Sequence, residues 1–149
     1  MAEVHVSQEI AASQEDTWKV FSDFSKFSDW LTIHDKFYGE PPTEIVVGST
    51  FTEQATIMGM SNKIEWTVEA FDAPKSLTIG GKGLAGAQIT FVLSLEATGE
   101  NSCTAKIDAE FVGTMVVGAI GAAVERAANK EVVASLEKLA AVLNQGGLA

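Results

Sequence analysis

The hydrophobic residues of this chain follow two different periods, and the change from one to the other occurs once, near Thr114. Before that point, apolar and polar residues alternate in several short segments, which predicts antiparallel strands with one buried and one solvated face. The two clearest apolar faces are Ile89, Phe91, Leu93 and Leu95, and then Cys103, Ala105, Ile107, Ala109 and Phe111. From about residue 114 to 144 the apolar residues recur at about 100° per residue, which predicts one long amphipathic helix.

The order of the predicted elements limits how these apolar surfaces can be covered. A strand over residues 3–11 precedes a short helix capped by Ser13 and a second short helical segment over residues 26–31. A sheet with a single apolar face must be covered, and the last helix has the long apolar stripe that this requires. The sequence therefore predicts an α+β fold, with a curved antiparallel sheet wrapped around a long C-terminal helix, as one domain over residues 1–149.

Charge and composition restrict the expected partners and compartment. The chain has 20 acidic against 10 basic residues, a net charge of −10, which disfavours binding to nucleic acids or anionic membranes. The longest apolar run, residues 115–124, is far shorter than the roughly 20 residues that span a bilayer, and the N-terminus does not resemble a secretory signal. We therefore expect a cytoplasmic protein, monomeric or homodimeric, without stable membrane insertion and without a nucleic-acid partner.

No metal site or cofactor is expected from the sequence. The chain has one cysteine, Cys103, on an apolar strand face, and its two histidines, His5 and His34, are far apart. Residues 81–86 match the glycine-rich dinucleotide fingerprint, which requires a helix after the glycines. Because a strand is predicted from Ala87, we interpret this segment as a hairpin connection.

The last helix is thin in its first half and bulky in its second. Glycines and alanines dominate up to about residue 123, whereas Leu136, Leu139 and Leu143 follow. The thin half predicts a space between helix and sheet, walled by Trp66, Phe91, Phe111 and Met115. The alternative is that the small residues let helix and sheet pack closely, without a cavity.

Several polar residues interrupt the apolar faces. Glu53 shares an apolar strand face, and Glu125 projects within about 40° of Leu139 on an ideal helix, with Asn129 beside it. A buried carboxylate needs a partner, so these groups are candidates for the orienting contacts of a cavity. The alternative is that a bulge turns Glu53 outward and that Glu125 lies at an exposed helix edge. His34 is a candidate general base.

The chain also resembles a known superfamily over nearly its whole length. The resemblance lies in the opening VHVSQEIAASQEDTWKVFSDF of residues 4–24, in the FSDWL of residues 27–31, and in the C-terminal helix that includes Leu136-Glu137-Lys138-Leu139. These segments resemble the START-like, or SRPBCC, superfamily with its helix-grip fold, and most of all its polyketide cyclase/dehydrase-type branch. The resemblance implies binding of a lipid, sterol, polyketide or other apolar molecule between sheet and helix. Some members are enzymes, but the superfamily has no common catalytic set to transfer.

Three functions are therefore considered. The first is binding of a small hydrophobic ligand; the second is a cyclase or dehydratase that uses a pocket carboxylate or histidine; the third is a chaperone-like or partner-binding module with an open apolar groove. The predicted ligand-binding residues are Trp30, Glu53, Trp66, Phe91, Phe111, Met115, Glu125 and Asn129, and the catalytic candidates are Glu125 and His34.

Overall fold

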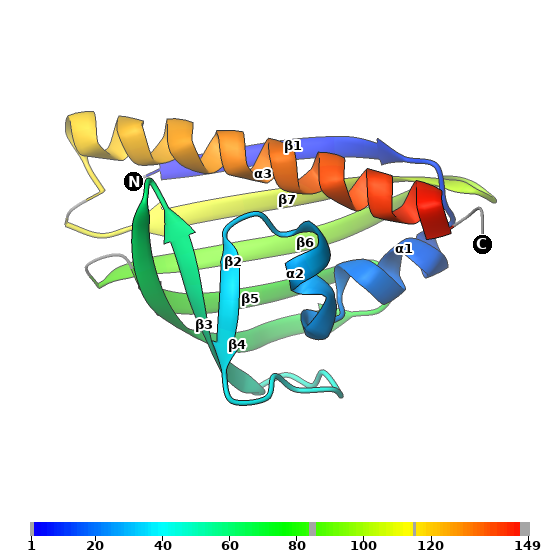
Figure 1. Cartoon of the computed structure of the whole chain (residues 1–149), viewed down its shortest axis with the longest axis horizontal. Helices are drawn as coiled ribbons and strands as arrows, with labels where there is room; N and C mark the ends of the chain where they lie inside the picture. The colour runs from blue at the N-terminus through cyan, green and yellow to red at the C-terminus, as the bar shows by residue number, and fades with distance from the viewer. Residues whose placement is uncertain (1, 84–85, 115, 147–149) are drawn as a thin grey trace.

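The computed structural model describes residues 2–83, 86–114 and 116–146, and within them the strands form one antiparallel sheet in the order β1-β7-β6-β5-β4-β3-β2 (Figure 1). The strands are β1 (Ala2–Ile10), β2 (His34–Tyr38), β3 (Thr50–Ile57), β4 (Met60–Asp72), β5 (Ser76–Gly83), β6 (Ala87–Gly99) and β7 (Ser102–Val112). The helices are α1 (Gln14–Phe21), the 3₁₀ turn η1 (Phe24–Lys26), α2 (Phe27–Trp30) and α3 (Gly118–Gly146).

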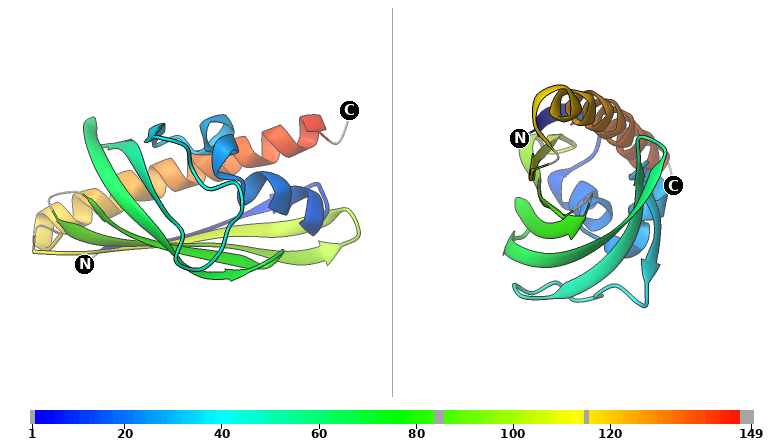
Figure 2. Two further views of the ribbon diagram at one scale, coloured as in Figure 1. Left: turned by 90° about the horizontal axis from the view of Figure 1, so that it is seen from below. Right: turned by 90° about the vertical axis from the view of Figure 1, so that its left-hand side faces the viewer.

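The sheet curves strongly and encloses one face of the long helix. Figure 2 shows the strands bending around a common interior, with α3 lying across the open side. The helix contacts β1 along its length, and the short helix α2 packs between α3 and β2. This arrangement confirms the predicted α+β fold with a sheet wrapped around the C-terminal helix.

Local sequence signals explain where the first helices begin and end. Ser13 caps α1 by accepting a hydrogen bond from the Asp16 backbone N–H at 3.1 Å, as its spacing predicts. The helix ends where the Ser22 hydroxyl donates to the Trp18 carbonyl at 2.7 Å. Trp18 and Phe21 are buried on the inner side of α1, so the helix covers one end of the sheet.

The strand β2 is the element that sequence reasoning missed. Its two partly buried residues, His34 and Phe37, are three positions apart and the other three residues are exposed, so the strand shows no clean alternation. The pairing of β2 with β3 shifts register at Asp35, where a β-bulge interrupts the ladder. The Asp35 carboxylate accepts hydrogen bonds from Thr56 Oγ1 at 2.5 Å and from Gln54 Nε2 at 3.3 Å, which fixes the bulge on the outer side of the sheet.

The glycine-rich segment over residues 81–86 joins β5 to β6. Strand β6 begins at Ala87, directly after Gly86 with its positive φ of 85°, so no helix follows the glycines. The interpretation as a hairpin connection is confirmed. Gly81 has a separate role, because a Cβ there would lie 2.8 Å from the Trp66 ring. Its small size lets the indole lie flat against the sheet.

The long helix begins later than the sequence pattern predicts. It starts at Gly118 instead of residue 114, and Val117, which lies within the range predicted as helical, precedes it and is 57% exposed. No helix among the described residues is long and apolar enough to cross a membrane.

Candidate functional site

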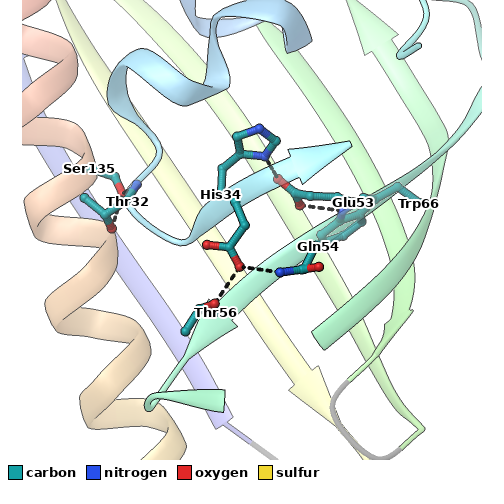
Figure 3. Close-up of polar contacts among 8 residues, drawn as sticks. Thr32, His34, Glu53, Gln54, Thr56, Trp66 and Ser135 are labelled. Carbon is teal, nitrogen blue, oxygen red and sulfur yellow. Dashed lines mark hydrogen bonds and ion pairs between the residues drawn. The ribbon is translucent and has the colours of Figure 1, made fainter. Parts of the chain in front are cut away.

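A buried polar centre lies on the inner face of the sheet, where β2 begins (Figure 3). The Glu53 side chain on β3 is only 1% exposed, and its Oε2 lies 2.5 Å from Nδ1 of His34, whose side chain is 5% exposed. The other carboxylate oxygen, Oε1, accepts a hydrogen bond from Trp66 Nε1 at 2.9 Å. The carboxylate therefore has a donor on each oxygen, which satisfies a group that burial alone would penalise.

The bulge at Asp35 is what brings His34 to Glu53. His34 pairs with Ala55 and Phe37 pairs with Glu53, although an unbroken strand would place residues 34 and 37 on opposite faces. The extra residue re-aims the strand, so that both His34 and Phe37 turn inward. The hypothesis that a bulge turns Glu53 outward is wrong, because the bulge is in β2 and Glu53 faces the interior.

Aromatic side chains surround the imidazole. The ring centroids of Phe37 and Phe27 lie 4.5 Å and 6.1 Å from that of His34. Such surroundings exclude water and strengthen the hydrogen bonds within the polar centre. With Nδ1 directed at Glu53, Nε2 of His34 has no hydrogen-bond partner in the described part of the chain.

A small cavity lies beside this centre, and Trp30 is one of its lining residues. It measures about 10 Å³ and is lined by Phe27, Trp30, Leu31, Glu53, Trp66, Ile79, Phe91 and Leu93. The indole N–H of Trp30 is fully buried and lacks a hydrogen-bond partner among the residues described. A space of this size admits about one water molecule.

A second small cavity leads from there toward α3. It also measures about 10 Å³, and it is lined by Leu31, Ile33, Ile57, Phe91, Ile107, Phe111, Ala128, Glu131, Val132 and Ser135. Leu31 and Phe91 belong to both linings, so these two side chains separate the cavities. Ligand pockets usually measure about 300–1,000 Å³. The groove between sheet and helix is therefore closed around these cavities.

The small residues of the last helix do not open a ligand-sized space in these two cavities. A Cβ at Gly121 would lie 3.1 Å from the backbone carbonyl of Val116, so this glycine lets the preceding loop fold closely against the helix. Gly113 similarly lies close to Ala87, because a Cβ at Gly113 would be 3.1 Å from the Ala87 Cα. Gly121 thus contacts the loop before α3, and Gly113, which precedes α3, contacts β6, so neither contact shows the close helix–sheet packing considered as the alternative. Met115, a predicted wall residue, lies outside the described residues.

Five predicted ligand-binding residues line the two cavities, and the catalytic candidate His34 is hydrogen-bonded to one of them, Glu53. Trp30, Glu53, Trp66 and Phe91 line the first cavity, and Phe111 joins Phe91 at the second. Tyr38, also on β2, is exposed and donates to Gln54 Oε1 at 3.0 Å.

Glu125 and Asn129 do not face the cavities, and the alternative, that Glu125 lies at an exposed helix edge, is the arrangement observed. Both side chains are exposed on α3, and Glu125 Oε1 accepts a hydrogen bond from the Glu3 backbone N–H at 3.0 Å. Glu3 belongs to β1, an edge strand whose outer N–H groups have no strand partner. The carboxylate reaches this donor at the sheet edge, because burial in the apolar stripe would leave it unpaired.

A cluster of hydroxyl groups fixes the segment between α2 and β2 to the long helix. The Thr32 backbone N–H donates to Ser135 Oγ at 3.0 Å (Figure 3). Thr32 Oγ1 donates to Glu131 Oε2 at 2.6 Å. Ser135 Oγ in turn donates to the Glu131 carbonyl at 2.8 Å. Leu31 immediately precedes Thr32, so these bonds hold it in place between the two cavities.

Two titratable groups with shifted pKa values lie away from the groove. A hydrogen bond from Nδ1 to Asp108, at 2.7 Å, raises the pKa of exposed His5 on the outer face. Burial raises the pKa of the Cys103 thiol, which donates to Thr17 Oγ1 at 3.3 Å. Within the described ranges, no three or more histidine, cysteine or acidic side chains are grouped to hold a metal ion.

A larger depression on the surface lies outside the groove. It measures about 840 Å³ and is lined by residues 22–25, residues 40–45 and Phe71. Phe24 lines it from the inner side and stacks on Phe51, with ring centroids 4.3 Å apart. These two rings stand between the depression and the interior of the sheet.

Comparisons with known proteins give a consistent relationship. Residues 1–144 match the family described as polyketide cyclase/dehydrase and lipid transport. The uncharacterized protein Rv1546 of Mycobacterium tuberculosis is 31% identical over 94% of this chain and 97% of its own length. The toxin Rv0910 of the same organism is 26% identical over 95% of this chain and 98% of its own length. A START superfamily protein from Mycobacterium smegmatis, 18% identical, has the same fold, with a TM-score of 0.78 over 97% of this chain and 99% of that one.

Proposed function

The chain belongs to the polyketide cyclase/dehydrase and lipid transport family, and we propose that its sheet–helix groove binds a small, largely apolar molecule. The polar centre of Glu53, His34 and Trp66 would orient that molecule. The observation that carries this proposal is the burial of a hydrogen-bonded carboxylate and imidazole, 1% and 5% exposed, among aromatic side chains.

Stability alone does not require a polar centre of this kind, because apolar side chains could replace it as a whole at little cost. Taking charged groups out of water is costly, and apolar side chains of similar volume serve a core equally well or better. Ligand sites, in contrast, are mainly apolar with a few placed polar groups. Glu53, His34 and the unpaired Trp30 N–H fit that composition.

Binding in the groove requires the protein to open. The two cavities of about 10 Å³ are too small for a ligand, and Leu31 and Phe91 separate them. Outward movement of Leu31 would join them into one space from the polar centre to α3. The apparent affinity would then be reduced by the fraction of molecules in the open state.

The test is a binding survey with matched variants. Fatty acids, sterols and aromatic polyketides are added to the protein, and binding is followed by native mass spectrometry and by thermal stabilisation. A ligand at 100 times its Kd raises the unfolding free energy by about 2.7 kcal/mol. We expect at least one compound class to bind, and Glu53→Gln to weaken it while the exposed Glu125→Gln does not. The absence of binding across the panel, or equal effects of the two substitutions, would contradict the proposal.

A cyclase or dehydratase is the second candidate, supported by the pairing of His34 with Glu53. A carboxylate that holds Nδ1–H leaves Nε2 as a base in the neutral imidazole. Such a base can take a proton alpha to a carbonyl; the enolate then attacks a second carbonyl and the alkoxide regains the proton. In this case His34→Gln abolishes turnover of a poly-β-ketone while the ligand still binds. Binding of the poly-β-ketone without turnover by the wild type would instead favour the binding function alone. The groove side chains described above are buried, so an open, partner-binding groove has no support.

A further inference from the structure

Beside the polar centre, the indole N–H of Trp30 is a hydrogen-bond donor that no described residue uses. Both oxygens of Glu53 already accept hydrogen bonds, from His34 and from Trp66. An indole N–H can only donate, and that of Trp30 is buried without a partner in the residues that the structure covers. Resting on the proposed function, we infer that the ligand carries a carbonyl oxygen and that the Trp30 N–H is the donor that binds it.

The size of the first cavity agrees with this assignment. Its volume of about 10 Å³ corresponds to one water molecule or one oxygen atom. A carbonyl oxygen placed there receives the Trp30 hydrogen bond and displaces at most one water. The apolar body of the ligand then extends past Leu31 into the mainly apolar second cavity beside Val132.

The same geometry selects against a pure hydrocarbon. A ligand without an acceptor would exclude water from the cavity and leave the N–H unpaired, which carries the full desolvation penalty of that group. A site built around a donor therefore rejects analogues that lack the acceptor. Trp30 is thus a specificity-determining residue, whereas the walls contributed by Leu31 and Phe91 accept any apolar body of suitable shape.

The experiment compares acetophenone with ethylbenzene, which have the same skeleton and differ in a carbonyl oxygen. Each is titrated into the ¹⁵N-labelled protein, and the indole resonances of the tryptophans are followed by NMR. We expect acetophenone to bind roughly 3- to 10-fold more tightly, the difference that one neutral hydrogen bond makes. The Trp30 indole proton should shift downfield with acetophenone but not with ethylbenzene.

Two variants isolate the indole N–H. Trp30→Phe should abolish the preference by weakening acetophenone alone. Trp18→Phe should retain it, because Trp18 packs on Phe71 and lines neither cavity. Equal affinities for the wild type, a preference that survives in Trp30→Phe, an unshifted Trp30 resonance, or no binding of acetophenone would each overturn the inference. The binding survey with fatty acids, sterols and aromatic polyketides tests the proposed function independently of this inference about Trp30. If Trp30→Phe does not fold, the resonance shift in the wild type still decides.

Discussion

Glu53 is the residue on which the buried polar centre depends, because both donors of that centre direct their hydrogens at its carboxylate. Its place on the inner face of β3 follows from the alternation of that strand, where Phe51, Ala55 and Ile57 are also buried. The hydrogen bonds with His34 and Trp66 hold the side chain there.

A matched pair of substitutions measures what this carboxylate contributes to stability. Glu53→Gln should lower the unfolding free energy by about 1–3 kcal/mol, because it replaces charge-assisted hydrogen bonds inside the core. The exposed Glu125→Gln should change it by less than about 0.5 kcal/mol. Chemical denaturation of both variants provides the measurement, and similar small losses for the two would show that the buried pair is energetically unimportant.

His5 predicts a pH dependence of stability from the outer face of the sheet. Its hydrogen bond with Asp108 raises its pKa in the folded protein above the value of 6.5. The stabilisation is therefore fully present below about pH 6.5 and is lost as the pH rises through the raised pKa. The difference in unfolding free energy between wild type and His5→Gln should be positive at pH 5 and vanish at pH 9. Asp108→Asn should remove the same pH-dependent stabilisation. A difference in unfolding free energy that is equal at pH 5 and pH 9 would contradict the role of the His5–Asp108 hydrogen bond.

At the scale of elements, the segment between α2 and β2 is the part that closes the groove. It carries Leu31, which separates the two cavities, and Thr32, which is hydrogen-bonded to α3. The described contacts of α3 with the groove thus combine apolar packing at Val132 with polar bonds at Ser135. The hydrogen bonds of Ser135 can be removed by substitution without changing the lining of the first cavity, to which Ser135 does not belong.

Loosening these bonds should favour the open state. Ser135→Ala leaves the Thr32 N–H unpaired, so we expect a loss of about 1–2 kcal/mol in stability. If the open state binds ligand, the apparent Kd of any panel compound that binds should fall, by up to about 10-fold, because a larger fraction of molecules is open. Thermal denaturation and calorimetric titration measure the two effects, with the exposed Ser61→Ala as control. An unchanged or weaker affinity in Ser135→Ala would show that this segment is not the gate.

The strands and helices differ in how far the sequence predicts them. The inner faces of β6 and β7 and the cap of α1 follow from alternation and from Ser13, because these signals are local. The pairing of His34 with Glu53 depends on the bulge at Asp35 and on strand pairing between residues 19 positions apart, so no local pattern contains it. The one local signal for this site in the sequence is Glu53, a charged residue on an otherwise apolar strand face. Glu125 follows the helical period but binds the edge of β1, which only the packing of α3 determines.

At the scale of the whole molecule, the interior is one continuous apolar core that extends from α1 to α3. Cys103 lies within it, on β7 behind α1, and is 0% exposed. Its raised pKa, caused by burial, lowers the thiolate fraction further. The thiol can therefore report when the core opens as a whole.

Thiol labelling of Cys103 should follow global unfolding. We expect the native protein to react slowly with an aromatic disulfide reagent, and the rate to rise with denaturant in parallel with the unfolded fraction. Rapid labelling that does not depend on denaturant would reveal local opening at α1 and would limit the core to the rest of the sheet.

The central claim is that a ligand occupies the groove between the sheet and α3, next to the buried polar centre. Intermolecular NOEs between the ligand that binds most tightly and the methyl groups of the protein test it most directly. The account predicts NOEs to Leu31, Ile57, Ile107 and Val132, all of which line the groove. NOEs confined to exposed Val46 and Val47 or to Ile45 in the outer depression would contradict it.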